Sequence, residues 1–222
     1  MELYEVMRTT FAAREYTGEA LPDAVLHEIL ENARFAPSGG NRQGNRVIVV
    51  RDPETRGRLA SLAEPAAKRY SAQIQAGESP WNTIVPTRVT AAEIAAAAAP
   101  AALTEPCRNA SVVLVFVVDL KAVAAMDQDL DRIGVIGGAS IYPFVWNVLM
   151  AARQAGFGGT ITTLAVAEEP AVKALLAIPP EFALCAVVPL GRPVKQLTKL
   201  RRRSVAQIAT RERFDGAAFT LG

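Results

Sequence analysis

The sequence predicts a single α+β domain. Its 222 residues, 50% of them hydrophobic and 21% charged, suit one globular domain with a sizeable core. Short β-branched runs alternate with helix-like segments, but without the regular strand–helix–strand series of a doubly wound fold. Neither an internal repeat nor a linker is visible, so we expect residues 1–222 to form one domain.

Two helices are predicted near the N-terminus. Apolar residues recur at helical spacing in 3–7 and again in 25–33. Pro22 and Asp23 suit the first turn of the second helix, because proline needs no N–H partner there and a carboxylate favours the positive helix end. This helix should end before Pro37.

A polar loop at 36–45 leads into the first predicted strand. The run 47–50 is β-branched throughout and is expected to be a strand buried on both faces. An Asp-Pro turn at 52–53 then opens a helix that extends to about Ala76. Residues 77–86 are expected to form a loop.

The middle of the chain combines an alanine-rich helix with an apolar strand. Thr90 and Glu93 form a capping-box pattern ahead of the alanine-rich run 91–103. Pro100 should end or kink that helix. The run 112–118 predicts a second buried strand.

The C-terminal half repeats this mixture of helices and strands. A long helix is predicted over 141–155, closed by Gly156. It is apolar nearly all round, which indicates either a central core helix or a subunit interface. Residues 158–163 resemble a strand, 170–176 a short helix and 182–190 a third apolar strand.

Composition excludes several function classes. A formal net charge of +2 is too small to indicate a nucleic-acid binder. The one histidine, His27, makes a histidine zinc site or a Ser-His-Asp triad improbable, and its place in the pattern indicates a helix surface. Cys107 and Cys185 form no CxxC pair or disulfide framework, which favours a reducing compartment. With an acidic N-terminus and no apolar run of about 18 residues, we expect a cytoplasmic protein without a membrane partner.

Two nucleotide-binding motifs are absent. The stretch 156–161 approaches a Gly-x-Gly-x-x-Gly pattern but has Ile161 in the third glycine position. Gly39 and Gly44 have P-loop spacing, yet Asn45 stands in place of the lysine. An enzyme without metal ligands or a nucleophile motif often relies on an organic cofactor.

Four polar segments, 8–16, 36–45, 156–163 and 199–203, together offer what a flavin site needs. A phosphate binds guanidinium and hydroxyl groups, and a flat ring binds backbone N–H groups that glycine allows to come close. Each segment alone also fits an ordinary role. These roles are a surface loop, tight sheet packing at 158–159 and a solvated basic tail.

Several motifs match one family in order. Residues 36–43 read Ala-Pro-Ser-Gly-Gly-Asn-Arg-Gln, similar to A-P-S-x-x-N-x-Q, and 156–163 are similar to G-L-G-x-x-x-T-T. Ile-Pro at 178–179, Pro-Leu-Gly-Arg-Pro at 189–193 and Arg-Arg-Ser-Val at 202–205 resemble three further motifs. In this order they resemble the nitroreductase family of FMN flavoproteins over nearly the whole chain.

The resemblance implies a three-layer α/β/α fold with a central, mainly antiparallel sheet, in an intertwined homodimer with two FMN sites. Residues 192–222 would form a tail that embraces the partner subunit. The implied roles are phosphate contacts from arginines, a flavin-lining loop from one subunit and threonines beside the ring. The implied cofactor-binding residues are Arg14, Pro37, Ser38, Asn41, Gln43, Thr162, Thr163, Arg201 and Arg202.

The family chemistry is ping-pong transfer from NAD(P)H through flavin N5 to a nitroaromatic, quinone or related conjugated acceptor. It needs no strong acid or base, which agrees with the scarcity of histidine. Two alternatives stay open: a flavin-dependent dehydrogenase of a dedicated metabolite, and a non-catalytic flavin-binding or storage protein. A nucleic-acid role for the arginine run ranks third. Trp81 and its neighbouring prolines make 77–90 a candidate lid.

The chain departs from the family pattern at two places. The family opens with an R-R-S-x-R run before an aromatic residue, and 10–16 keeps only the last arginine and the aromatic. The missing groups would remove charge-assisted bonds worth about 1.5–3 kcal/mol each. Arg8, Thr9 and Thr10 are candidates to compensate. After the loop, Gly-Asn at 44–45 replaces the usual Pro-Trp and is expected to reshape the pocket.

Overall fold

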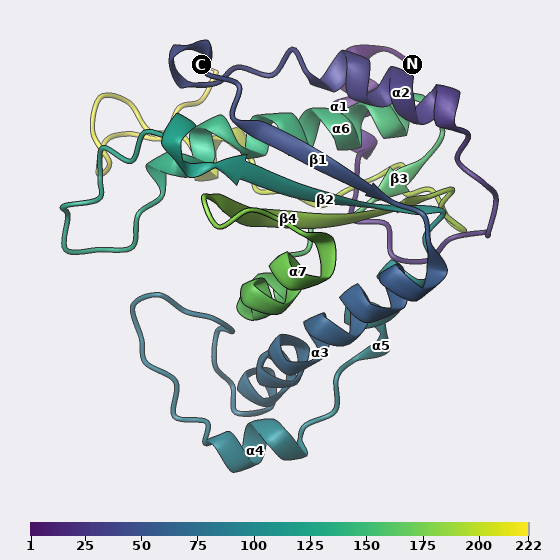
Figure 1. The fold of residues 1–222 in the computed structure, drawn as a ribbon. Coiled ribbons are helices and arrows are strands. Elements are labelled where there is room, and N and C mark those ends of the chain that lie inside the picture. The colour runs from purple at the N-terminus through teal and green to yellow at the C-terminus, as the bar shows by residue number, and fades with distance from the viewer. Residues whose placement is uncertain (222) are drawn as a thin grey trace.

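The computed structural model describes residues 1–221. They form three layers, with a central sheet between two layers of helices (Figure 1). The sheet contains β1 (Asn45–Val50), β2 (Val112–Asp119), β3 (Gly158–Gly159) and β4 (Phe182–Gly191). The described helices are α1 (Leu3–Thr9), α2 (Asp23–Ala33), α3 (Pro53–Gln75), α4 (Ala91–Ala96), α5 (Ala101–Asn109), α6 (Tyr142–Gln154) and α7 (Glu169–Leu176).

The strands lie in the order β1-β2-β4-β3, and each neighbouring pair is antiparallel. Val47 of β1 pairs with Phe116 of β2, and Leu114 of β2 pairs with Val188 of β4. The predicted α+β class and the mainly antiparallel sheet are therefore confirmed.

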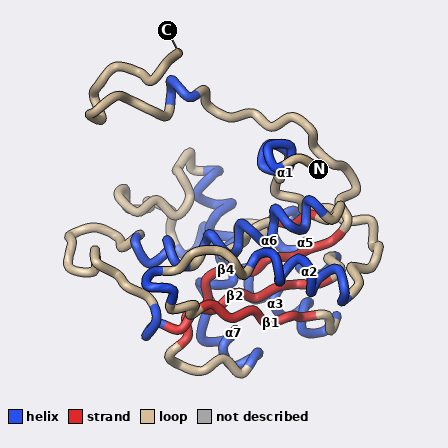
Figure 2. Tube along the Cα trace, turned by 90° about the horizontal axis from the view of Figure 1, so that it is seen from above, coloured by secondary structure: helices blue, strands red, loops and turns tan. Residues whose placement is uncertain are grey.

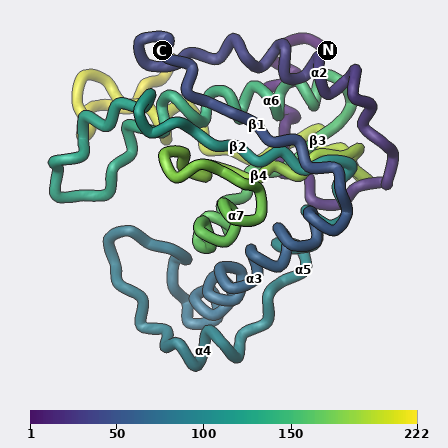
Figure 3. The backbone as a smooth tube through the Cα atoms, viewed as in Figure 1, coloured from purple at the N-terminus to yellow at the C-terminus, as the bar shows by residue number. Residues whose placement is uncertain are grey.

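Alternation along β2 divides the core into two halves. Leu114 and Phe116 point toward α2 and α6, whereas Val113 and Val115 point toward α3, α5 and α7. All four side chains are at most 1% exposed, because helices cover both faces of this strand. The same layering is visible in Figure 3, where α3, α5 and α7 lie on one side of the sheet and α2 and α6 on the other. It gives the α/β/α arrangement that the resemblance implies.

The prediction that 47–50 is buried on both faces was wrong. β1 occupies an edge of the sheet, and Val49 is 43% exposed while Val50 is buried. A β-branched run signals strand propensity, but it does not distinguish an edge strand from a central one.

Two further expectations need correction. The strand predicted over 158–163 is limited to Gly158–Gly159, and within 160–163 the chain pairs with β4 through an isolated bridge between Thr162 and Val187. The alanine-rich run 91–103 also belongs to two helices. The first, α4, ends at Ala96, and Pro100 is the N-cap of the second, α5. The predicted capping box of Thr90 and Glu93 is present.

Beyond β4, the chain forms no further core element, as the sequence indicated. Its one regular piece among the described residues is a short 3-10 turn, Val205–Gln207. Figure 2 shows this segment running away from the three layers. Several of its apolar side chains are exposed: Val194, Val205, Ile208, Phe214 and Leu221. Among the described helices, none combines the length and the apolar character that a membrane crossing requires.

Candidate functional site

The segment around Arg14 is attached to the end of the sheet where β4 finishes. Ala13 N–H donates to Gly159 O at 3.0 Å, and Val194 N–H donates to Glu15 O at 3.1 Å. These backbone bonds hold the segment on both sides of Arg14, whose own side chain is exposed. The backbone at Arg14 is therefore fixed, while its guanidinium makes one long hydrogen bond, to Ala12 O at 3.4 Å, and otherwise faces solvent.

Tyr16 anchors the same segment. Its hydroxyl lies 2.8 Å from Ala13 O and 3.0 Å from Pro189 O. Burial raises the pKa of Tyr16, so the phenol is neutral and acts as an anchor for the backbone. The ring packs on Gly191, where an added Cβ would lie 2.7 Å from the ring. The aromatic residue of the N-terminal motif and the glycine of the Pro-Leu-Gly-Arg-Pro motif thus form one contact.

Arg14 shares a pocket of about 190 Å³ with Thr162 and Thr163, three of the predicted cofactor-binding residues. Thr160 and Cys107 also line it. Thr162 N–H is occupied by Val187 O at 2.9 Å. In the described part of the chain, Thr163 N–H has no such partner and is available to a ligand. This pocket combines a guanidinium with hydroxyl and amide donors.

Of the three residues proposed to replace the missing phosphate contacts, Arg8, Thr9 and Thr10, the two threonines cannot reach a phosphate. The hydroxyls of Thr9 and Thr10 donate to Glu5 O and Val6 O, each at 2.7 Å, and both residues are buried. They serve α1 and cannot point to a phosphate. Arg8 is exposed, and it remains the candidate of the three.

The glycines of the second motif have a structural role. An added Cβ at Gly159 would lie 2.4 Å from Pro189 O and 2.5 Å from the Leu190 side chain. Only glycine allows β3 to approach β4 this closely. Of the two interpretations of 158–159, tight sheet packing therefore accounts for the glycines.

The loop 36–43 is held in an unusual conformation. Asn41 and Gln43 have φ angles of 54° and 50°, which few residues other than glycine adopt. Gln43 N–H donates to Ser38 Oγ, and Gly39 N–H donates to Ser140 Oγ, both at 3.0 Å. Such strain is often found at functional sites, which agrees with the expectation that this loop takes part in one.

Ser38 and Gln43 line a pocket of about 200 Å³. Arg34, Arg46 and Phe144 line it too, and the sequence did not single out the two arginines. Pro37 and Asn41 belong to the same loop but not to the pocket lining.

The chain brings the predicted residues together in two separate groups. The loop at 36–43 leads into β1, next to the end of the sheet where β4 begins, because Asn45 pairs with Val118. Arg14 lies where β4 ends. Arg201 and Arg202 are exposed in the tail and line neither pocket.

A larger pocket of about 530 Å³ adjoins the Arg14 pocket, and the two share Tyr70, Thr163 and Leu164. Pro80 and Trp81 form part of its wall. The sequence indicated Trp81 as part of a lid, but it gave no sign of Tyr70, which lies in an otherwise ordinary helix. Among the described residues, no cluster of histidine, cysteine or acidic side chains could hold a metal ion.

The chain was compared with models of known protein families. The nitroreductase family model matches residues 7–192, which include the motifs at 36–43, 156–163 and 178–179 and all but the last residue of the motif at 189–193. This chain belongs to the nitroreductase family.

Individual relatives are more distant. An NADH dehydrogenase from Thermus thermophilus is 46% identical over 50 residues, covering 22% of this chain and 24% of the relative. An iodotyrosine deiodinase from Haliscomenobacter hydrossis is 33% identical over 63 residues, or 28% of either chain. These matches span only about a quarter of each curated relative.

The likeness of fold covers much more of the chain. A crystal structure of oxidized iodotyrosine deiodinase bound to FMN and 3-iodo-L-tyrosine has a TM-score of 0.66. The match covers 96% of this chain and all of the other at 21% identity. The chain thus has the nitroreductase fold over nearly its whole length.

Proposed function

We propose that the protein is an FMN-dependent NAD(P)H oxidoreductase that reduces a quinone, nitroaromatic or related conjugated acceptor. The observation that carries the proposal is the pocket where Arg14 meets Thr162 and Thr163. The relatives support it, since they include an NADH dehydrogenase and an FMN-bound deiodinase. For a quinone the balanced reaction is NAD(P)H plus a proton plus quinone, giving NAD(P)⁺ plus hydroquinone.

The residues fit FMN by the chemistry of their donors. The Arg14 guanidinium suits a phosphate, and the free N–H and hydroxyl of Thr163 suit the edge of a hydrogen-bonding ring. FMN would supply the hydride-accepting chemistry. The protein would orient it, exclude water and place positive charge near the ring, without a side chain that transfers protons as a strong acid or base.

The two separated groups of predicted residues favour a homodimer. Ser38, Asn41 and Gln43 lie on a strained loop at the opposite end of β4 from Arg14. A two-fold axis would bring this loop of one subunit to the Arg14 pocket of the other. The exposed apolar tail, 192–221, would then pack on the partner subunit and carry Arg201 and Arg202 with it.

The acceptor pocket favours an uncharged ring. The described residues that line it carry no formal charge: Ala66, Tyr70, Pro80, Trp81, Thr163, Leu164, Val166 and Ala167. An amino-acid substrate such as iodotyrosine has an ammonium and a carboxylate group that would need partners in such a site. This composition supports quinones or nitroaromatics over deiodination.

The test is the visible spectrum of the purified protein, supplemented with FMN and then mixed anaerobically with NADH or NADPH. We expect flavin absorption bands that bleach with either nucleotide and return when a quinone is added. A protein that binds FMN without bleaching would be a storage protein. A protein that binds no FMN would refute the proposal.

A further inference from the structure

We propose that Glu78 is a positioning residue that holds Trp81 as a fixed wall of the acceptor pocket, and that this wall selects flat, uncharged rings. The inference rests on the proposed function, because it assigns specificity to the same site. It differs from a mobile lid, in that the wall is already built in the free protein.

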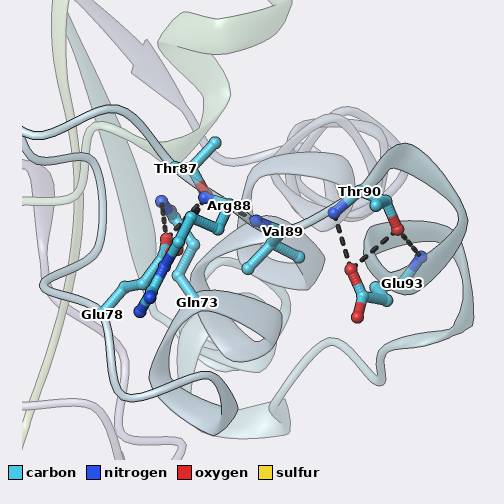
Figure 4. Close-up of polar contacts among 7 residues, drawn as sticks. All are labelled: Gln73, Glu78, Thr87, Arg88, Val89, Thr90 and Glu93. Atoms are coloured by element: carbon cyan, nitrogen blue, oxygen red, sulfur yellow. Dashed lines mark hydrogen bonds and ion pairs between the residues drawn. The ribbon is translucent and has the colours of Figure 1, made fainter.

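The carboxylate of Glu78 is the centre of a hydrogen-bond network that closes the loop at 77–88 (Figure 4). One oxygen accepts from Arg88 N–H at 2.7 Å, and the other accepts from Thr87 Oγ1 at 2.6 Å and from Gln73 Nε2 at 3.2 Å. The Glu78 side chain is only 12% exposed. These contacts hold the pKa of Glu78 below its ordinary value, first through Thr87. The ionised carboxylate therefore ties both ends of the loop to α3.

The network reaches Trp81 through one further side chain. Gln73 is 2% exposed, and its amide oxygen accepts from Trp81 N–H at 3.1 Å. Because Glu78 binds the Gln73 amide nitrogen, it fixes which way the amide faces. Glu78 thus determines that Gln73 presents an acceptor to Trp81.

Trp81 is held in a conformation that it would not adopt freely. Its φ angle is 55°, a strained value for a large side chain. The Arg69 guanidinium lies over the indole, 4.1 Å from the ring centroid. With the backbone fixed by Gln73 and the indole in contact with Arg69, Trp81 lines the pocket beside Thr163 and Tyr70.

This arrangement selects a ligand by shape and charge. A flat ring gains stacking and burial against the indole. A charged group would lose hydration against lining residues that carry no formal charge, since Arg69 stacks on the indole and does not itself line the pocket. We infer that a neutral quinone is bound well and a sulfonated quinone poorly.

The first experiment measures the oxidative half-reaction, so that nicotinamide binding plays no part. FMN-loaded protein is reduced with a stoichiometric amount of dithionite and mixed with 2-methyl-1,4-naphthoquinone, its 3-sulfonate or ferricyanide. Trp81→Ala should raise the concentration of neutral quinone for half-maximal rate about ten-fold. It should also reduce the preference for the neutral quinone over the sulfonate, with each quinone rate divided by the ferricyanide rate of the same variant to correct for any change in access to the flavin. An unchanged neutral-quinone dependence would overturn the inference.

Glu78→Gln provides the test of positioning. An amide offers a donor where Glu78 now accepts, so the network cannot be completed. We expect the half-maximal quinone concentration to shift in the direction of Trp81→Ala but by less, about three-fold. Glu93→Gln is the matched control, since Glu93 likewise accepts from Thr90 N–H and Oγ1, at 2.7 Å each, but caps the next helix. Equal effects of the two variants would contradict a specific role for Glu78.

A second readout needs no flavin. In a Trp146→Phe background Trp81 is the one remaining tryptophan, so its emission reports the wall directly. Glu78→Gln should increase acrylamide quenching of this emission. Quenching by 2-methyl-1,4-naphthoquinone should need a higher quinone concentration in the Trp146→Phe/Glu78→Gln protein than in the Trp146→Phe protein. Unchanged quenching in Glu78→Gln would overturn the inference even if NAD(P)H reduces FMN. A protein that fails to bind FMN would refute the proposed function alone.

Discussion

Two loops of this protein, 36–43 and 77–88, are built by the same device and differ in what the sequence reveals about them. Each contains a large or polar residue with a positive φ angle, Asn41 and Gln43 in one and Trp81 in the other. Each is also closed by side chains that accept from backbone N–H groups. The first loop matches a family motif residue by residue, and the second matches none.

Under the proposed function, this difference separates the loop that would contact the cofactor from the loop that would contact the acceptor. FMN is bound in the solved deiodinase structure that shares this fold, and the loop proposed to contact FMN here matches a motif of the family. The relatives carry names for different reactions, NADH dehydrogenase and iodotyrosine deiodinase. A loop that faces the acceptor is free to change its sequence while keeping a rigid backbone.

The largest effect is expected on the cofactor side. Arg14→Gln removes charge-assisted bonds to the FMN phosphate worth about 1.5–3 kcal/mol, so the FMN dissociation constant should rise about 10- to 100-fold. Fluorescence titration of FMN measures it. The matched control is Arg58→Gln, an exposed arginine of α3 outside both pockets and outside the 36–43 loop, which should bind FMN normally. Equal affinity of Arg14→Gln and wild type would break the assignment of this pocket to the cofactor.

A smaller effect should follow from changes at Asn41. Asn41→Ala loses the amide and places an alanine at a φ of 54°, which costs about 1–2 kcal/mol. Asn41→Gly loses the amide but tolerates the backbone. We expect FMN affinity to fall about ten-fold in the alanine variant and less in the glycine variant. If glycine were as damaging as alanine, the strained backbone would have no part in the site.

The loop at 127–135 is a third loop closed by a side chain, and its stability should depend on pH. Asp127 is 3% exposed and accepts from Val135 N–H at 2.7 Å and from Arg132 at 2.8 Å. These bonds, the one from Val135 first, lower its pKa from 3.8 to about 2. The stabilisation is therefore complete above pH 3.8 and is lost as the pH falls through about 2.

Asp127→Asn should accordingly lower the melting temperature at pH 7, with a gap to wild type that narrows toward pH 2. Thermal unfolding followed by circular dichroism at pH 7, 4 and 2.5 measures this gap. Other carboxylates titrate equally in both proteins, so the difference isolates Asp127. A gap independent of pH would mean that the carboxylate charge does not organise the loop.

Much of the fold was predictable because it depends on local patterns. The spacing of apolar residues predicted α2, and the β-branched run at 112–118 predicted β2. The edge position of β1 was not predictable, since it depends on which strand lies beside it. The extent of β3 was overestimated, because the two glycines that permit its contact with β4 are followed by residues that leave the sheet.

For the site too, local motifs were predictable and contacts between distant segments were not. Motifs identified the residues around Arg14 and Thr162, and the structure places them in one pocket. Thr9 and Thr10 looked available as phosphate ligands until their hydroxyls were seen to bond to α1. The connection from Glu78 through Gln73 to Trp81 involves residues that are ordinary in sequence and meaningful only in three dimensions.

The account depends most on the claim that each FMN site combines Arg14 of one subunit with the 36–43 loop of the other. Mixing Arg14→Gln with Asn41→Ala after unfolding and refolding them together tests it directly. A mixed dimer would contain one site with both changes and one with neither, so about a quarter of all sites should regain wild-type FMN affinity. A mixture that binds FMN no better than the two separate variants would contradict the claim.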